Sequence, residues 1–363
     1  MLVTLRHKEI MGYCLMENTA LKAINKTSRD IYLDAVKGFL ILCIVLEHNH
    51  LLTTQYDWIR PFSDAFAAGC FLILTFAWPL KKTNLLNFVD KYFSYWWPFI
   101  GFITATSILN FYFYNNSQYS HAILSYFNAI LLASPQAIKV SSGFMYFWFL
   151  PCLCLLYLIR RVLSYVGKHA YIIAFIPWLL IGELSDELLI RTPYSLHVIA
   201  FILPIGLCYS KLHKRLIQPS LVMRVSTVIA FITCAVSSYF IGWELFLAGG
   251  IIPSIKQPAL LVFYSVFMLV AIPGIYNLFS FTPKLISNFF AFIGTHSMKV
   301  YLLHPLIYIS ITKILPIIDG AILSFLITIA LSLLVSHVLV KVAALNKLIF
   351  PNAFSALNFS RKS

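Results

Sequence analysis

Long apolar runs separated by short polar loops repeat along the chain from residue 33 to residue 342. A helix needs about 20 apolar residues to cross the hydrocarbon core of a bilayer. Runs of this kind predict about ten transmembrane helices, and several of them contain no charged residue. The clearest spans are 140–159, 225–243, 258–281 and 321–340, and less clean spans lie near 33–52, 62–80, 95–113, 168–184, 193–210 and 286–311.

A shorter apolar segment, 121–133, is predicted to form an interfacial or re-entrant helix, because it falls short of the length of a span. The spans leave no stretch for a separate soluble core. We therefore expect an all-α, polytopic integral membrane protein. It would consist of an N-terminal tail (1–32), one transmembrane domain (33–342) and a C-terminal tail (343–363).

The composition agrees with a membrane protein, since 60% of the residues are hydrophobic and only 11% are charged. Ordinary soluble proteins carry about 25% charged residues. The net charge of +14 would point to nucleic acid in a soluble protein. Here the basic residues lie in short loops between apolar spans, a pattern that reports membrane topology, so no nucleic-acid partner is expected.

The Lys and Arg residues also predict the orientation of the chain. With ten spans, about twenty basic residues fall on the side of the N-terminus and about five on the opposite side. Positive loops face the cytoplasm, so both termini are expected there, in a multi-pass protein of the cell inner (cytoplasmic) membrane. The basic residues expected outside are Arg60, Lys139, Arg191, Lys256 and Lys313.

Six of the seven cysteines lie inside apolar segments, where packing is their expected role. We expect no disulfide framework, no metal site and no permanently bound cofactor. Membrane lipid is an expected partner of every span.

The first span carries a polar stripe. Lys37 and His48 are eleven residues apart, which places them about 20° apart on one helix face, and Asp34 lies about 40° from His48. Lys37 would lie roughly 16 Å below His48, toward the cytoplasm. A cation there would attract an anionic molecule, and an imidazole deeper in would act as a general base. In the alternative, Asp34 and Lys37 form an interfacial ion pair and His48 bonds a neighbouring helix.

A second polar stripe lies in the span 286–311, where Ser297, Tyr301 and His304 are spaced i, i+4 and i+7. This span and the first run in the same direction. Counting residues from the cytoplasmic end puts both imidazoles at similar depth, about 22 to 27 Å up. They are expected to share one outer-leaflet pocket; the alternative is hydrogen bonding between helices with no catalytic role.

Three segments resemble the membrane-bound acyltransferase-3 family. LDAVKGFLILCIVLEH matches a family motif in which ten residues separate an Arg or Lys from a His, here Lys37 and His48. GFMYFWFLPCL (143–153) resembles an aromatic helix of the family, and GTHSMKVYLLHPLI (294–307) resembles a late helix. The order of the three segments agrees, and LDAVKG most resembles the branch of fucose 4-O-acetylases and related sugar O-acetyltransferases.

The resemblance implies transfer of an acetyl group from cytosolic acetyl-CoA, as co-substrate, to a sugar hydroxyl. The acceptor would be a cell-surface glycan or its lipid-linked precursor, such as O-antigen, capsule or exopolysaccharide. His48 would be the catalytic residue, either as general base or as carrier of the acetyl group. Donor-binding candidates are Lys37, Arg29 and Lys91, and acceptor or pocket candidates are Asp34, Trp148, Ser297, Tyr301 and His304.

The chain departs from the family pattern in three places. Glu47 precedes His48 where a small or apolar residue is usual, Lys91 stands alone where relatives often carry two arginines, and the second span matches poorly. An ideal helix would turn Glu47 about 100° away from His48, so we expect it to leave that imidazole unaffected. The rival interpretation is a secondary transporter or flippase for a sugar or lipid-linked glycan, which should show paired broken helices.

Overall fold

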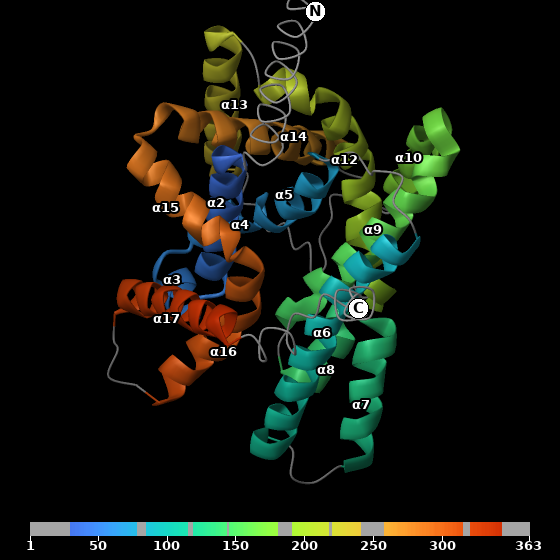
Figure 1. Ribbon diagram of the computed structural model, residues 1–363, viewed down its shortest axis with the longest axis vertical. Helices are drawn as coiled ribbons and strands as arrows, with labels where there is room; N and C mark the ends of the chain where they lie inside the picture. Colours follow the sequence, from blue (N-terminus) through green and yellow to red (C-terminus); the bar gives the residue numbers. More distant parts are fainter. Residues whose placement is uncertain are drawn as a thin grey trace, which may run out of the picture.

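The computed structural model describes residues 30–77, 85–114, 119–143, 145–180, 191–217, 220–240, 258–314 and 320–342. Over these residues the chain is helical and contains no strand, which confirms the predicted all-α class (Figure 1). The α-helices are α2 (Ile31–Glu47), α3 (His50–Gln55), α4 (Ile59–Asp64), α5 (Ala67–Leu74), α6 (Leu85–Tyr114), α7 (Tyr119–Leu132), α8 (Pro135–Ser142), α9 (Phe149–Val166), α10 (Ala170–Leu180), α12 (Leu196–Ile217), α13 (Leu221–Phe240), α14 (Pro258–Phe281), α15 (Lys284–Thr295), α16 (Ser297–Ile314) and α17 (Ala321–Lys341).

Five described helices are long and apolar enough to cross a membrane. They coincide with five of the predicted spans, while the total of about ten spans stays a prediction. The cytoplasmic placement of the termini is likewise untested, and most of both tails lies outside the described residues. The five helices are Tyr146–Val166, Pro193–His213, Leu221–Phe240, Leu261–Phe281 and Ala321–Leu339.

The two predicted spans that carry His48 and His304 are interrupted. The span 33–52 divides into α2 and α3, because Asn49 leaves the helical conformation and its side chain caps α3. The span 286–311 divides into α15 and α16 at His296, whose ring Nδ1 lies 2.9 Å from the Phe292 carbonyl oxygen. Side chains that satisfy carbonyls at a helix end favour termination there.

α2 and α15 pack with their backbones in direct contact. A Cβ atom on Gly38 would overlap the carbonyl of Phe290, and one on Gly294 would overlap the carbonyl of Asp34. Small residues permit such close packing of helices in membranes, where apolar burial gives little driving force. Phe39 of α2 packs beside this crossing against Phe290, with ring centroids 6.2 Å apart.

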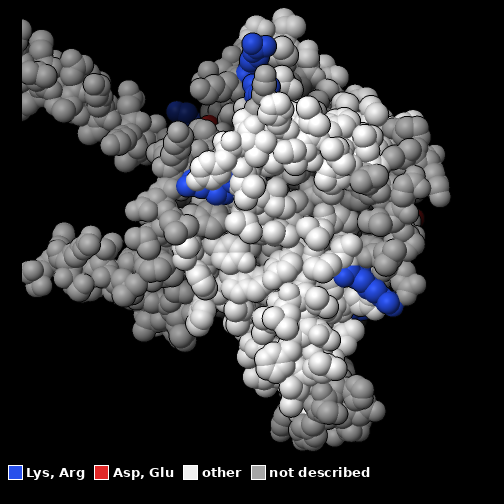
Figure 2. All heavy atoms as spheres, turned by 90° about the vertical axis from the view of Figure 1, so that its right-hand side faces the viewer, with Lys and Arg blue, Asp and Glu red and all other residues white. Residues whose placement is uncertain are grey.

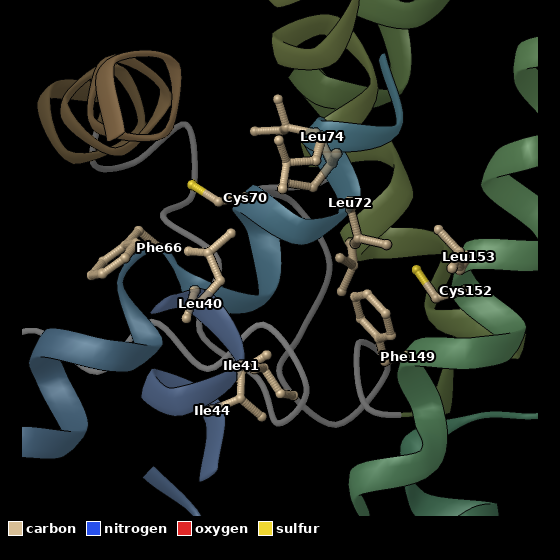
Figure 3. Close-up of a cluster of buried hydrophobic side chains, with 14 of the residues drawn as sticks. Leu40, Ile41, Ile44, Phe66, Cys70, Leu72, Leu74, Phe149, Cys152 and Leu153 are labelled. Carbon is tan, nitrogen blue, oxygen red and sulfur yellow. The ribbon is translucent and has the colours of Figure 1, made fainter. Parts of the chain in front are cut away.

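A buried apolar cluster joins α2 to α9 through α5 (Figure 3). Leu40, Ile41 and Ile44 of α2 face the side chains of α5, while Leu72 on the other side of α5 lies toward Phe149 of α9. Cys70 and Cys152 are both buried in this cluster, in the packing role expected of them. The short α5 thus fixes the position of the first helix relative to α9.

The exterior of several helices is apolar. In α13, Val222 is 74% exposed and Phe240 is 78% exposed, and Figure 2 shows a face with few charged side chains among the described residues. Apolar surface of this extent is unfavourable in water and favourable against lipid. The exterior therefore agrees with a membrane protein.

Candidate functional site

His48 lies in the short junction between α2 and α3. Asn49 is buried; its side chain accepts a hydrogen bond from the N–H of Leu52 at 3.1 Å and donates to Oγ of Ser324 in α17 at 3.4 Å. These bonds hold the junction from both sides. The imidazole of His48 therefore projects from a helix end whose backbone is fixed, and not from the middle of a span.

His304 lies in α16 and is 1% exposed. Its Nε2 is 3.0 Å from Nδ1 of His48, and its Nδ1 is 3.1 Å from the carbonyl oxygen of Val300. The two rings have planes only 4° apart and centroids 5.2 Å apart. The structure thus brings together the two imidazoles that the sequence placed at similar depth.

Tyr146 covers His48, with ring centroids 3.8 Å apart. Gly143 ends α8 in the left-handed conformation at φ 78°, and the chain then turns toward the histidines. Tyr301 donates a hydrogen bond to the carbonyl of Tyr146 and so fixes this turn. The hydroxyl of Tyr146 lies 3.4 Å from Nε2 of His50.

A cavity of about 130 Å³ opens beside the two histidines. None of the described residues that line it carries a permanent charge, so it suits an uncharged polar group such as a hydroxyl. Three histidines and two tyrosines are among its lining residues. The lining residues are Val45, His48, Asn49, His50, Gly143, Tyr146, His304, Pro305, Tyr308, Ile309 and Thr328.

Asp34 and Lys37 form an ion pair near the start of α2, with Nζ 3.0 Å from Oδ1. The carboxylate is buried, and the lysine side chain is 26% exposed. This pair is the structural alternative considered from the sequence. Asp34 is not among the described residues that line the cavity at the histidines, and its role as an acceptor or pocket residue stays a prediction.

The side chains of the other two donor-binding candidates, Arg29 and Lys91, lie outside the described part of the chain. Arg29 lies outside the described residues. Lys91 belongs to α6, but its side chain is outside the described part of the chain. Their binding roles stay predictions.

The remaining pocket candidates, Tyr301, Trp148 and Ser297, differ in their distance from the cavity. Tyr301 is buried behind the cavity, with its ring centroid 6.1 Å from that of His304. Trp148 is buried in the short helix Met145–Trp148, and Ser297 begins α16; neither lines the cavity. Tyr301 therefore supports the site through Tyr146, and the pocket roles of Trp148 and Ser297 stay predictions.

Glu47 lies closer to His48 than the helical spacing predicted. Its Oε1 is 3.5 Å from Nε2 of His48. The backbone is still helical at His48, so the expectation failed for another reason: the long glutamate side chain bends back toward its neighbour. Glu47 places a carboxylate beside the nitrogen of His48 that does not face His304.

The site residues that the sequence analysis did not predict include Asn49, Tyr146 and Tyr308. Tyr308 follows His304 by four residues and would have emerged from extending the stripe of the second cluster by one turn. Tyr146 lies in the aromatic segment that was singled out, where Trp148 was chosen instead. The role of Asn49 depends on a helix break for which the apolar pattern gave no signal.

Comparison with known proteins identifies the family of the chain. Residues 30–341 match the acyltransferase-3 family model (Acyl_transf_3), which describes an acyltransferase domain. No curated protein and no solved structure matches the chain. The matched region contains the site histidines and nearly the whole described fold. The chain is therefore an acyltransferase that belongs to the acyltransferase-3 family.

Proposed function

We propose that the protein transfers an acetyl group from cytosolic acetyl-CoA to a sugar hydroxyl of a cell-surface glycan or its lipid-linked precursor. The observation that carries the proposal is the pair formed by His48 and His304 beside a cavity without permanent charges. Acyl transfer to a hydroxyl needs a base positioned at the attacking oxygen. A sugar hydroxyl is the uncharged polar group that such a cavity suits.

His48 acts as the general base in this proposal. It takes the proton of the acceptor hydroxyl as the oxygen attacks the thioester carbonyl carbon. A C–O bond forms, the C–S bond breaks, and the proton passes from His48 to the departing thiolate of coenzyme A. Direct transfer accounts for the geometry with one base. An acetyl-histidine intermediate would require a second attack, by the acceptor oxygen on the acetyl carbonyl carbon, with the histidine nitrogen as the leaving group.

The donor enters from the side of Lys37. Phosphate groups are natural partners for lysine and arginine, and the partly exposed Lys37 is accessible to them despite its pairing with Asp34. Arg29 and Lys91 are the further donor-binding candidates. The eleven residues from Lys37 to His48 correspond to roughly 16 Å of helix, a distance along which the pantetheine arm would extend.

Family membership does not favour the rival function of a transporter or flippase. The proposed function also keeps the predicted orientation, with the N-terminus in the cytoplasm and the histidine pair toward the outer leaflet of the cell inner membrane. This orientation puts the donor and the acceptor on opposite sides of the site.

The experiment compares the surface glycan of a strain that carries the gene with that of a strain that lacks it. O-acetyl resonances in the NMR spectrum of the purified glycan should disappear in the deletion strain and return when the gene is restored. An identical O-acetyl pattern in both strains would contradict the proposed acceptor class. The position of the lost resonance would also identify the acylated sugar.

A further inference from the structure

Three groups form one hydrogen-bonded line in the site: the carbonyl of Val300, the ring of His304 and the ring of His48. The distances along the line are 3.1 Å from the carbonyl oxygen to Nδ1 of His304, and 3.0 Å from Nε2 of His304 to Nδ1 of His48. All three groups lie within the described residues, and His304 is almost completely buried.

The rings are arranged for a direct N–H···N bond. Their planes are 4° apart, and the centroid separation of 5.2 Å is about what two imidazoles have when a 3.0 Å bond joins them in line. A face-to-face stack at this separation would not bring two nitrogens so close. The contact between the rings is therefore a hydrogen bond that requires one donor and one acceptor.

The hydrogen bond to the Val300 carbonyl determines which ring nitrogens of His304 and His48 carry a hydrogen. A backbone carbonyl can only accept, so Nδ1 of His304 carries a hydrogen and donates it. A neutral imidazole has a single N–H, which leaves Nε2 of His304 as an acceptor. Nδ1 of His48 must then be the donor to His304, and Nε2 of His48 has no hydrogen.

We infer that His304 is a positioning residue that holds His48 in the Nδ1–H tautomer, so that Nε2 of His48 is the nitrogen that receives the proton of the acceptor. The inference rests on the proposed function only for the identity of that acceptor. The tautomer itself depends on the Val300 carbonyl and on the two rings.

Glu47 completes the arrangement from the opposite edge of the His48 ring. Its Oε1 lies 3.5 Å from Nε2 of His48. Once Nε2 takes a proton, the imidazolium of His48 has an acceptor at each N–H, with His304 at Nδ1 and the Glu47 carboxylate near Nε2. Charge that develops on the base during transfer is therefore stabilised by groups already in place.

The first test reads the tautomer without any activity. Full-length protein labelled with ¹⁵N-histidine is studied in lipid bilayers at neutral pH by solid-state NMR, and the His48 signals are those lost in His48→Gln. We expect a protonated Nδ1 and an unprotonated Nε2. A protonated Nε2, in either the other neutral tautomer or an imidazolium, would overturn the inference. Because no acceptor is involved, this result is independent of whether the proposed glycan is the substrate.

The second test separates positioning from packing. In His304→Gln the side-chain amide oxygen can accept from Nδ1 of His48, whereas His304→Leu keeps the bulk and offers no acceptor. Initial rates are measured with ¹⁴C-acetyl-CoA and membrane vesicles that carry the native glycan precursor. We expect His304→Leu to lower kcat by about 100-fold, which is the lower end of general-base effects, and to leave KM nearly unchanged. We expect kcat of His304→Gln to be at least about tenfold higher than that of His304→Leu.

Equal losses of kcat in the two variants, or a change confined to KM, would overturn the positioning role. If His304→Leu fails to accumulate in the membrane, the positioning role is tested by the kcat of His304→Gln together with the NMR result. A loss in His304→Gln as large as that of His48→Ala would then contradict the inference.

Discussion

Gly38 of α2 and Gly294 of α15 lie against each other's helix backbones, and each precedes by ten residues the histidine that its segment brings to the site. The two segments contact each other at the glycines and, ten residues later in each, at His48 and His304. They therefore run in the same direction. The close crossing therefore sets the spacing of the histidines. The same region holds the Asp34–Lys37 pair, so one helix contact positions both ends of the proposed reaction path.

The Gly38→Ala substitution tests the crossing. The added methyl group would overlap the Phe290 carbonyl, and overpacking of this kind typically costs about 1–3 kcal/mol. We expect a lower midpoint of thermal unfolding and a lower kcat. The matched control is Gly101→Ala in α6, where a Cβ meets nothing within 4 Å. Equal midpoints for the two variants would show that the crossing has room to adjust.

The Tyr301→Phe substitution tests the support of Tyr146. It removes the donor to the Tyr146 carbonyl and leaves a buried acceptor without that bond, at a typical cost of about 1–3 kcal/mol. Because Tyr146 covers His48, we expect acetyl transfer to fall about tenfold, a change equal to about 1.4 kcal/mol. Rates with labelled acetyl-CoA check this, with Tyr165→Phe at an exposed position of α9 as the control. A rate unchanged from that control would contradict the supporting role.

The Glu47→Gln substitution tests the carboxylate beside His48. We expect kcat to fall about tenfold while KM stays nearly constant, because the contact strengthens only when His48 is protonated in the transition state. The amide keeps the shape of the side chain and removes its charge. A rate equal to wild type would support the original expectation that Glu47 leaves His48 unaffected.

The Lys37→Gln substitution tests donor binding. We expect KM for acetyl-CoA to rise at least about fivefold with a smaller change in kcat, since loss of an ion contact to phosphate affects donor binding more than chemistry. The control is Lys284→Gln, which removes an exposed lysine at the start of α15. If both variants show the same KM, Lys37 serves only in its ion pair with Asp34.

Much of the fold followed from apolar length alone. The spans that the structure shows as long apolar helices are continuous runs, and lipid requires such runs to be helical because no water satisfies their backbone groups. The interruptions after His48 and at His296 did not follow, because they depend on side chains of Asn49 and His296 that bond local backbone groups. Such bonds change the chain path without changing its hydropathy.

The site was predictable where it depends on regular helix and unpredictable where it depends on tertiary contact. Counting residues along parallel segments placed His48 near His304, since rise per residue is nearly constant. Tyr146 reaches them through tertiary contact, because Gly143 ends α8 and Tyr301 bonds the Tyr146 carbonyl. Glu47 was misplaced because the helical angle describes the direction of the Cβ atoms, whereas a long side chain can bend back toward its neighbour.

The most direct test of the central claim is the rate of acetyl transfer by His48→Ala. Membrane vesicles with matched amounts of protein are supplied with ¹⁴C-acetyl-CoA, and His337→Ala, at an exposed histidine of α17, serves as the control. A positioned general base contributes about 10²–10⁴-fold, so the His48→Ala rate should fall by at least 100-fold while the control stays at the wild-type rate. Acetyl transfer by His48→Ala within a few fold of wild type would contradict His48 as the base.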